Sequence, residues 1–140
     1  MGRTVAEPTA ITAGWWDATR DRRLVVQTCE SCGQRQHEPR ALCTGCGRTD
    51  ALALVDAAGT GRVHSFTVIH RAPSDEVTAP YVVAIVELDE GVRLLTNLVD
   101  VEPDDVACDQ PVAVQWEPLD DGRHLPLFTP VLPSDPTAQA

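Results

Sequence analysis

The apolar residues of the chain fall into short runs that alternate with polar residues and are separated by Gly, Pro and Asp. This alternation is typical of β-strands, and the runs are rich in Val, which strands favour. The pattern predicts strands at residues 24–28, 52–55, 62–70, 81–88, 92–98, 112–116 and 125–128, with a further short strand within 34–40. We therefore expect a mainly β protein.

The segments between these runs predict how the strands are connected. Residues 89–91 (Asp-Glu-Gly) and 120–122 (Asp-Asp-Gly) are tight turns, and Pro103 followed by two Asp predicts one helical turn. Residues 51–130 would then hold about five barrel strands, with the helical turn before the fourth. This arrangement favours a small closed Greek-key barrel of the OB type. An immunoglobulin-like sandwich, which needs about seven strands, ranks second.

Residues 12–20 (Thr-Ala-Gly-Trp-Trp-Asp-Ala-Thr-Arg) predict a helix of about two turns with Thr12 as its N-cap. This helix carries Trp15 and Trp16. Adjacent residues point about 100° apart on a helix, so a helix this short cannot bury both rings against one narrow seam. Because a large exposed aromatic ring is a typical interface anchor, we predict that Trp15 and Trp16 contact a partner.

Four of the five cysteines form two Cys-x2-Cys pairs, Cys29/Cys32 and Cys43/Cys46, separated by ten residues. Each pair offers two sulfur ligands from one tight loop, and two such loops complete a tetrahedron around a metal ion. Gly follows each pair, where the chain must turn sharply. We expect one structural zinc ion per chain, because a closed four-sulfur shell leaves no open position for catalysis. A rubredoxin-like iron site and two disulfides are the alternatives.

Charge and composition restrict the partners of the protein. The 140 residues carry a formal net charge of −10, and all eleven basic residues are Arg. Phosphate backbones and anionic lipid repel such a chain, so we expect neither nucleic acid nor a membrane as a partner. The N-terminal residues lack a signal-peptide core, and no run approaches the ~18 apolar residues of a membrane helix. We therefore expect a cytoplasmic protein, whose paired cysteines stay reduced and bind metal.

These elements divide the chain into four parts. We expect an N-terminal helical segment at residues 1–23, a zinc ribbon at 24–50, an OB-fold barrel at 51–130 and a flexible tail at 131–140. The sequence shows no Ser/His/Asp order, paired catalytic carboxylates or Gly-rich phosphate loop. Arg35, Arg40 and Arg48 surround the cysteine pairs and could meet a phosphate group, although a solvated face also explains them.

The order of these features resembles the zinc-ribbon/OB-fold accessory proteins of acyl-CoA metabolism, long catalogued as a domain of unknown function. The match covers roughly residues 13–130. The matching residues are Trp15-Trp16, Arg23-Leu24-Val25-Val26-Gln27 before the first cysteine pair, Glu38-Pro39-Arg40 before the second, Gly59-Thr60-Gly61-Arg62-Val63, Ser65-Phe66-Thr67-Val68, the run 79–88 with its following Asp-Glu-Gly turn, and Leu94-Leu95-Thr96-Asn97-Leu98. One departure is Asp21, which stands where many relatives have Gly, so the end of the helix should be shaped differently.

The resemblance implies a rubredoxin-like zinc ribbon, a five-stranded OB-fold barrel and no activity of this chain alone. Members of the family are subunits or appended domains that assemble with thiolase-superfamily enzymes or enoyl-CoA hydratase-like proteins and help form the acyl-CoA channel. Relatives take part in acetoacetyl-CoA condensation, polyketide-type acyl transfer and retro-aldol cleavage of steroid side-chain CoA thioesters. Arg35 and Arg40 would then be candidates for binding the CoA phosphates.

Three other functions stay open. Zinc ribbons and OB barrels also occur in single-stranded nucleic-acid-binding proteins, which need a basic groove and stacking aromatic rings. Here the barrel segment holds only Phe66, Tyr81, Trp116 and Phe128. A rubredoxin-like electron carrier would hold iron, and an autonomous hydratase or aldolase would need an acid/base pair that the sequence does not show.

Overall fold

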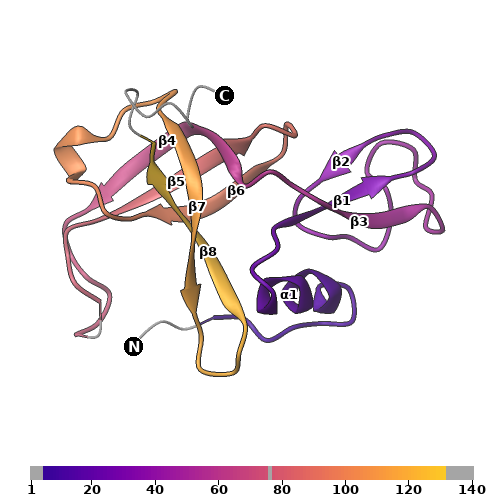
Figure 1. Ribbon diagram of the computed structural model, residues 1–140, viewed down its shortest axis with the longest axis horizontal. Helices are drawn as coiled ribbons and strands as arrows, with labels where there is room; N and C mark the ends of the chain where they lie inside the picture. Colours follow the sequence, from indigo (N-terminus) through magenta and orange to yellow (C-terminus); the bar gives the residue numbers. More distant parts are fainter. Residues whose placement is uncertain (1–4, 76, 132–140) are drawn as a thin grey trace.

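The computed structural model describes residues 5–75 and 77–131, and these ranges contain one α-helix, eight strands and one 3-10 turn. A small three-stranded sheet lies at one end of the molecule and a closed barrel at the other, with α1 between them (Figure 1). The expected mainly β fold with a short N-terminal helix is confirmed. Within the described ranges, no helix is long and apolar enough to cross a membrane. The predicted tail lies outside the described residues from 132 onward.

Helix α1 runs from Ala13 to Arg20, close to its predicted bounds. Thr12 is the N-cap residue, as predicted, but its side chain makes no cap hydrogen bond to the helix. The Thr12 hydroxyl instead accepts the Thr9 N–H (2.9 Å), and the Thr9 hydroxyl accepts the Thr12 N–H (3.2 Å). This reciprocal pair holds the turn that leads into the helix.

The far end of α1 is closed by a Schellman turn. Asp21 keeps a negative φ of −98°, and the left-handed conformation falls on Arg22, whose φ is 55°. The Arg22 N–H donates to the Thr19 carbonyl (2.9 Å) and the Arg23 N–H donates to the Ala18 carbonyl (3.0 Å). Asp21 therefore needs no positive φ in this chain.

Three antiparallel strands form the ribbon sheet in the order β2-β1-β3. Their bounds are Val25–Cys29 for β1, Arg35–Gln36 for β2 and Leu52–Asp56 for β3. β3 pairs with β1 along its whole length, from Asp56 opposite Val25 to Leu52 opposite Cys29. The boundary predicted between ribbon and barrel, at residue 50/51, assigns this strand to the barrel, whereas the structure places it in the ribbon sheet. An apolar run predicts that a strand forms, but it does not predict which distant strand it pairs with.

The other five strands close into the barrel, in the order β4-β5-β6-β8-β7. Their bounds are Thr60–Ile69 (β4), Tyr81–Leu88 (β5), Arg93–Leu98 (β6), Pro111–Pro118 (β7) and His124–Pro130 (β8), with the 3-10 turn η1 at Pro103–Asp105 before β7. β6 and β8 are parallel and the other neighbours are antiparallel. This closed five-stranded arrangement confirms the predicted OB-type barrel and not the sandwich.

The barrel is filled by apolar side chains that alternate along its strands. On β5, Val82, Ala84, Val86 and Leu88 are buried, while the residues between them are partly or fully exposed. Gly61 lies against the backbone of β5, where any Cβ atom would collide with the Glu87 carbonyl oxygen. The absence of a side chain at Gly61 thus lets β4 approach β5 closely.

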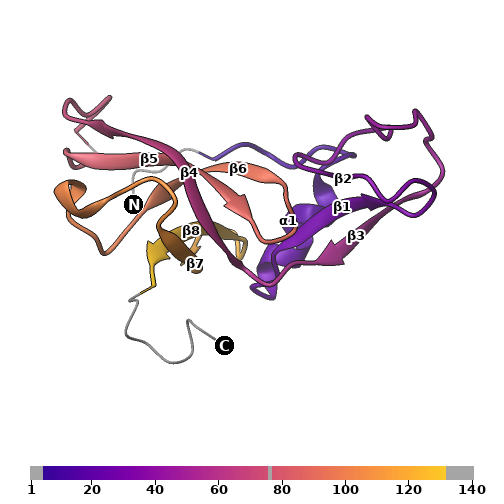
Figure 2. The same cartoon turned by 90° about the horizontal axis from the view of Figure 1, so that it is seen from above.

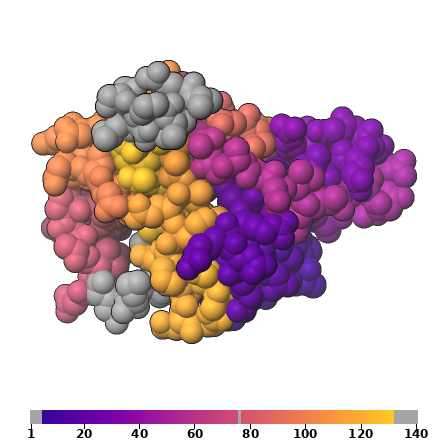
Figure 3. All heavy atoms as spheres, viewed as in Figure 1, coloured from indigo at the N-terminus to yellow at the C-terminus, as the bar shows by residue number. Residues whose placement is uncertain are grey.

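Helix α1 joins the two modules (Figures 2 and 3). Toward the barrel, the Thr19 hydroxyl accepts the His124 N–H (3.2 Å), and Arg20 Nη1 donates to the Asp121 carbonyl (2.7 Å). Toward the ribbon, the indole N–H of Trp15 donates to the Val25 carbonyl (3.1 Å). The helix therefore fixes the ribbon to the barrel, although the two sheets share no strand.

Candidate metal centre

Two loops with the same hydrogen-bond pattern carry the four cysteines. The N–H of the first cysteine in each pair, Cys29 or Cys43, donates to the carbonyl five residues later, at 2.8 and 2.9 Å. The N–H of the Gly four residues later donates back to that cysteine's carbonyl, at 2.8 Å in both loops. Gly33 and Gly47 have φ values of 81° and 79°, which only Gly adopts at little cost. The Gly after each pair is therefore required by the loop.

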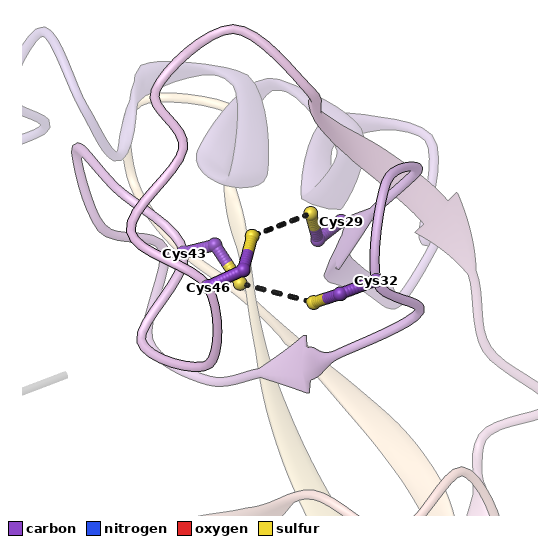
Figure 4. Close-up of side chains that lie close together, drawn as sticks. All are labelled: Cys29, Cys32, Cys43 and Cys46. Atoms are coloured by element: carbon purple, nitrogen blue, oxygen red, sulfur yellow. Dashed lines mark hydrogen bonds between the residues drawn. The ribbon is translucent and has the colours of Figure 1, made fainter.

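The two loops bring the four sulfur atoms together (Figure 4). The Sγ atoms of Cys29 and Cys46 are 3.8 Å apart, those of Cys32 and Cys43 are 3.5 Å apart, and all four lie within 4.8 Å of one another. A tetrahedral zinc ion with Zn–S bonds of about 2.3 Å separates its sulfur ligands by about 3.8 Å. All four cysteines are free, so the two-disulfide alternative does not fit.

The surroundings of the cluster shift the pKa values of two of its cysteines in opposite directions. The backbone N–H groups of Cys46 and Gly45 lower the pKa of Cys43 to about 6. Against the lowering effect of a backbone hydrogen bond at Gln34, the hydrogen bond with Cys43 and burial raise the pKa of Cys32 to about 12. Arg48 lies beside the cluster, and its pKa is raised by its hydrogen bond with Asp50 and then by the negative charges of Cys46 and Cys29. Four sulfur ligands with adjacent positive charge can bind a metal ion in a closed shell. Such a shell holds the loops together but offers no site for a substrate.

Two buried glutamines hold the segment between the cysteine pairs, a feature that the sequence analysis missed. Gln27 and Gln36 are 8% and 6% exposed, and the Gln36 amide donates to Gln27 Oε1 (2.6 Å). Gln27 also accepts the Arg40 N–H (2.8 Å) and donates to its carbonyl (3.0 Å). Gln36 accepts the N–H and the hydroxyl of Thr44 (3.0 and 2.9 Å). The two side chains therefore hold the backbone of Arg40 and Thr44 by hydrogen bonds, as the backbone of a neighbouring strand would.

Trp15 and Trp16 pack edge to face, with ring centroids 4.8 Å apart. Trp15 is only 8% exposed, and its ring lies 5.7 Å from that of His37 in the ribbon. Trp16 is half-buried and carries the Arg123 guanidinium 4.6 Å from its ring centre. The helix therefore does not bury both rings, as expected: the ribbon covers Trp15, which is not an exposed anchor, whereas Trp16 keeps an accessible part. Contact of these residues with a partner stays a prediction.

Arg35 and Arg40 are both exposed, on different segments. Arg35 Nη1 on β2 donates to the Glu90 carbonyl in the β5–β6 turn (3.2 Å), so it links ribbon and barrel. The backbone of Arg40 is held by Gln27, as described above, and its side chain lies at the surface. Binding of CoA phosphates by these residues stays a prediction.

Two family profiles match consecutive parts of the chain. The profile of the ChsH2 rubredoxin-like zinc ribbon domain matches residues 16–52, and that of the ChsH2 C-terminal OB-fold domain matches residues 54–117. The profiles separate the same two modules, but they meet inside β3, so the OB-fold profile begins within a strand that pairs in the ribbon sheet.

Individual relatives are also similar. The chain is 44% identical over 123 residues to a probable enoyl-CoA hydratase alpha subunit of Thermomonospora curvata, a match that covers 88% of this chain but 38% of that protein. It is 39% identical over 94 residues to a DUF35 domain-containing scaffold protein of Methanothermobacter thermautotrophicus, covering 66% of this chain and 70% of that protein. A chain of the solved Ltp2–ChsH2(DUF35) aldolase matches with a TM-score of 0.84 at 41% identity, covering 91% of this chain and 100% of that chain.

Proposed function

This chain belongs to the DUF35 family of proteins with a ChsH2-type zinc ribbon and OB-fold, and on that premise we propose that it is a non-catalytic subunit of an acyl-CoA-processing enzyme. The observation that carries the proposal is the likeness, over 91% of this chain, to a chain of the Ltp2–ChsH2(DUF35) aldolase. The partner we infer is a thiolase-superfamily enzyme of the thiolase, acyltransferase or retro-aldolase type. A hydratase-like protein is the second candidate, from the likeness to a hydratase alpha subunit.

The metal centre supports a structural contribution of the ribbon. We infer that Cys29, Cys32, Cys43 and Cys46 hold one zinc ion per chain, and zinc would supply four bonds that tie the two loops together. All four ligand positions are filled by sulfur, so the chain itself keeps no position for an activated water. A reducing compartment such as the cytoplasm suits four thiolates that must not form disulfides.

A groove on the barrel supports a place beside the acyl chain of the substrate. Its volume is about 540 Å³, and it lies between the loop before β5, strand β6 and the β7–β8 hairpin. Its apolar lining includes Val77, Tyr81, Val83, Leu95, Val99 and Leu125. Leu95 is 72% exposed, so this large apolar side chain of β6 lies mostly in contact with solvent. In the proposed complex this groove forms one wall of the acyl-CoA channel.

The inferred partner surface includes the accessible part of Trp16, whereas Trp15 supports it from beneath. Replacing Trp16 by Ala should weaken the complex roughly tenfold or more, because buried interface Trp side chains commonly contribute about 2 kcal/mol. Replacing Trp15 by Ala should mainly lower the melting temperature. For Arg35 and Arg40, substitution by Ala should raise the KM for acyl-CoA in the complex if they bind its phosphates.

Co-expression with a thiolase-superfamily enzyme from the same organism tests the proposal. We expect the two proteins to co-elute in size-exclusion chromatography, and the zinc content of the complex to equal the number of these chains. Separate elution of the two folded proteins would contradict the proposal.

The alternative of single-stranded nucleic-acid binding gains no support from the barrel. Phe128 is fully buried, and Phe66 and Trp116 pack against the core, so these three rings are not presented as a stacking platform. We expect no measurable binding of single-stranded DNA at about 0.15 M salt in a polarisation titration.

A further inference from the structure

Strand β3 is one of the two outer strands of the ribbon sheet and lies along its edge (Figure 2). It pairs with β1 on one side, and no strand among residues 5–75 and 77–131 pairs with its other side. Natural edge strands are commonly protected by Pro, Lys or a bulge. The sequence Leu52–Asp56, Leu-Ala-Leu-Val-Asp, contains no Pro or Lys, and its pairing with β1 runs without a register shift.

The hydrogen bonds at both ends of β3 show which backbone groups face the open edge. The Glu30 N–H donates to the Ala51 carbonyl (2.7 Å), and the Ala57 N–H donates to the Leu24 carbonyl (2.8 Å). Bonded residues alternate along an antiparallel pair, so residues 53 and 55 also face β1. The N–H and C=O groups of Leu52, Leu54 and Asp56 therefore point away from the sheet.

The side chains of this edge are apolar on both faces and its charges are paired. Leu54 is 37% exposed on one face and Val55 is 50% exposed on the other. Near one end of the strand Asp50 is bound by Arg48 (3.0 Å), and at the other end Asp56 is bound by Arg23 (2.6 Å). A chain of net charge −10 thus presents a locally neutral, apolar strand edge.

We propose that β3 is a docking edge to which the partner enzyme adds one β-strand, an inference that rests on the function proposed above. The added strand carries apolar side chains beside Leu54 and Val55 and a Lys or Arg opposite Asp56. Main-chain hydrogen bonds to residues 52, 54 and 56 supply affinity, and the flanking side chains supply selectivity.

The charge of Asp56 favours such a partner over a second copy of this chain. Arg23 contacts only Oδ1 of Asp56, and the carboxylate side chain is 65% exposed, so it can accept a second cation. Antiparallel self-pairing centred on Leu54 would place Leu52 of the second copy opposite Asp56. Two copies would also bring together two chains of net charge −10.

A proline substitution tests the edge without breaking the ribbon. Leu54→Pro removes an outward N–H and places the ring where the new strand would bind, whereas the hydrogen bonds to β1 use residues 53 and 55. Leu54→Ser removes the side chain but keeps the N–H. Leu42→Ser removes another exposed leucine of the ribbon, 45% exposed, as a control.

The measurement is the Kd of each zinc-loaded full-length variant for the thiolase-superfamily partner. We expect Leu54→Pro to weaken binding roughly tenfold or more relative to Leu54→Ser, and Leu42→Ser to change it less than about threefold. In amide hydrogen exchange, the Leu54 N–H should be fast in the isolated chain and protected in the complex, whereas the Val55 N–H is protected in both.

The outcomes separate this inference from the proposed function. A wild-type complex whose Kd is equal for Leu54→Pro and Leu54→Ser, with an unprotected Leu54 N–H, overturns the docking edge and leaves the accessory function intact. Absence of any complex with wild-type chain overturns both. A concentration-dependent dimer of the isolated chain that Leu54→Pro abolishes would assign the edge to a second copy and overturn the partner-strand assignment.

Discussion

The metal-binding end of the ribbon, residues 29–50, and the barrel are held together by different forces. In residues 29–50 the buried residues are Cys29, Gln36, Pro39 and Cys43, and none is a large aliphatic or aromatic side chain. The barrel instead encloses Phe128 and a set of valines at 2% exposure or less: Val63, Val82, Val86 and Val112. The ribbon end therefore cannot depend on apolar burial, and its order must come from sulfur–metal bonds and buried hydrogen bonds.

The start of β1, unlike residues 29–50, is held by apolar packing against α1 and the barrel core. Leu24, Val25 and Val26 join the same apolar cluster as Trp15 and the barrel residues. The boundary between metal-dependent and apolar packing thus falls at Cys29, inside the ribbon sheet and not between the two modules. The disorder caused by loss of the metal should therefore not extend from the cysteine loops past Cys29 into the start of β1.

Removal of the metal should have the largest effect. Structural zinc contributes on the order of 10 kcal/mol of apparent binding free energy in small modules. We expect Cys43→Ser, or a strong chelator, to release zinc and disorder residues 29–50 while the barrel amides stay protected, as checked by hydrogen exchange and elemental analysis. Cys108→Ser, which changes an exposed cysteine outside the cluster, is the control. Iron in the purified protein, or a ribbon that stays ordered without metal, would contradict this account.

The opposite experiment removes apolar packing from the barrel. Phe128→Ala should destabilise the protein by about 3–5 kcal/mol, because it empties the centre of the core. Thermal unfolding with a zinc-release indicator would check this. We expect zinc to remain bound in the folded variant, since no cysteine ligand lies in the barrel. Loss of zinc before unfolding would show that the two regions are coupled more tightly.

The elements of the barrel could be predicted from the sequence because its strands carry regular apolar alternation and clear turns. The cysteine spacing predicted the metal cluster equally well. The pairing of β3 with β1 could not be predicted, because a strand's apolar pattern does not identify its neighbour. Gln27 and Gln36 were missed for a similar reason: a glutamine signals burial only when its partner across the strands is known. The burial of Trp15 depends on the second module, which helix periodicity alone does not include.

The glutamine pair offers an intermediate effect. Gln36→Ala leaves the Thr44 N–H without its partner and removes one of the two donors to Gln27 Oε1, so we expect a loss of about 1–3 kcal/mol and faster zinc exchange. Gln34→Ala removes an exposed amide that contacts Thr44, and should change little. Zinc release to a competing chelator would compare the two variants. Equal rates would show that the buried pair does not hold the ribbon.

The smallest expected effect is a dependence on pH. Burial lowers the pKa of His37 below its ordinary value of 6.5. The unfolded chain therefore binds this proton at a higher pH than the folded chain, and stability is lost as the pH falls from 6.5 toward the lowered pKa. One proton limits the slope to about 1.4 kcal/mol per pH unit.

His37→Phe keeps a ring beside Trp15 but removes the titration. The stability difference between wild type and this variant should shift in favour of the variant below pH 6.5, as chemical denaturation with excess zinc would show. His70→Phe, at an exposed position, should leave the pH dependence unchanged. A pH-independent difference for His37→Phe would contradict the burial effect.

Turnover of an acyl-CoA thioester by the separated and recombined proteins tests the accessory function most directly. This chain alone, the thiolase-superfamily partner alone and the mixture of both should be assayed at equal concentrations. The account predicts no turnover by this chain, little by the partner and full activity only in the mixture. Turnover by this chain alone, or equal activity of the partner with and without it, would contradict the account.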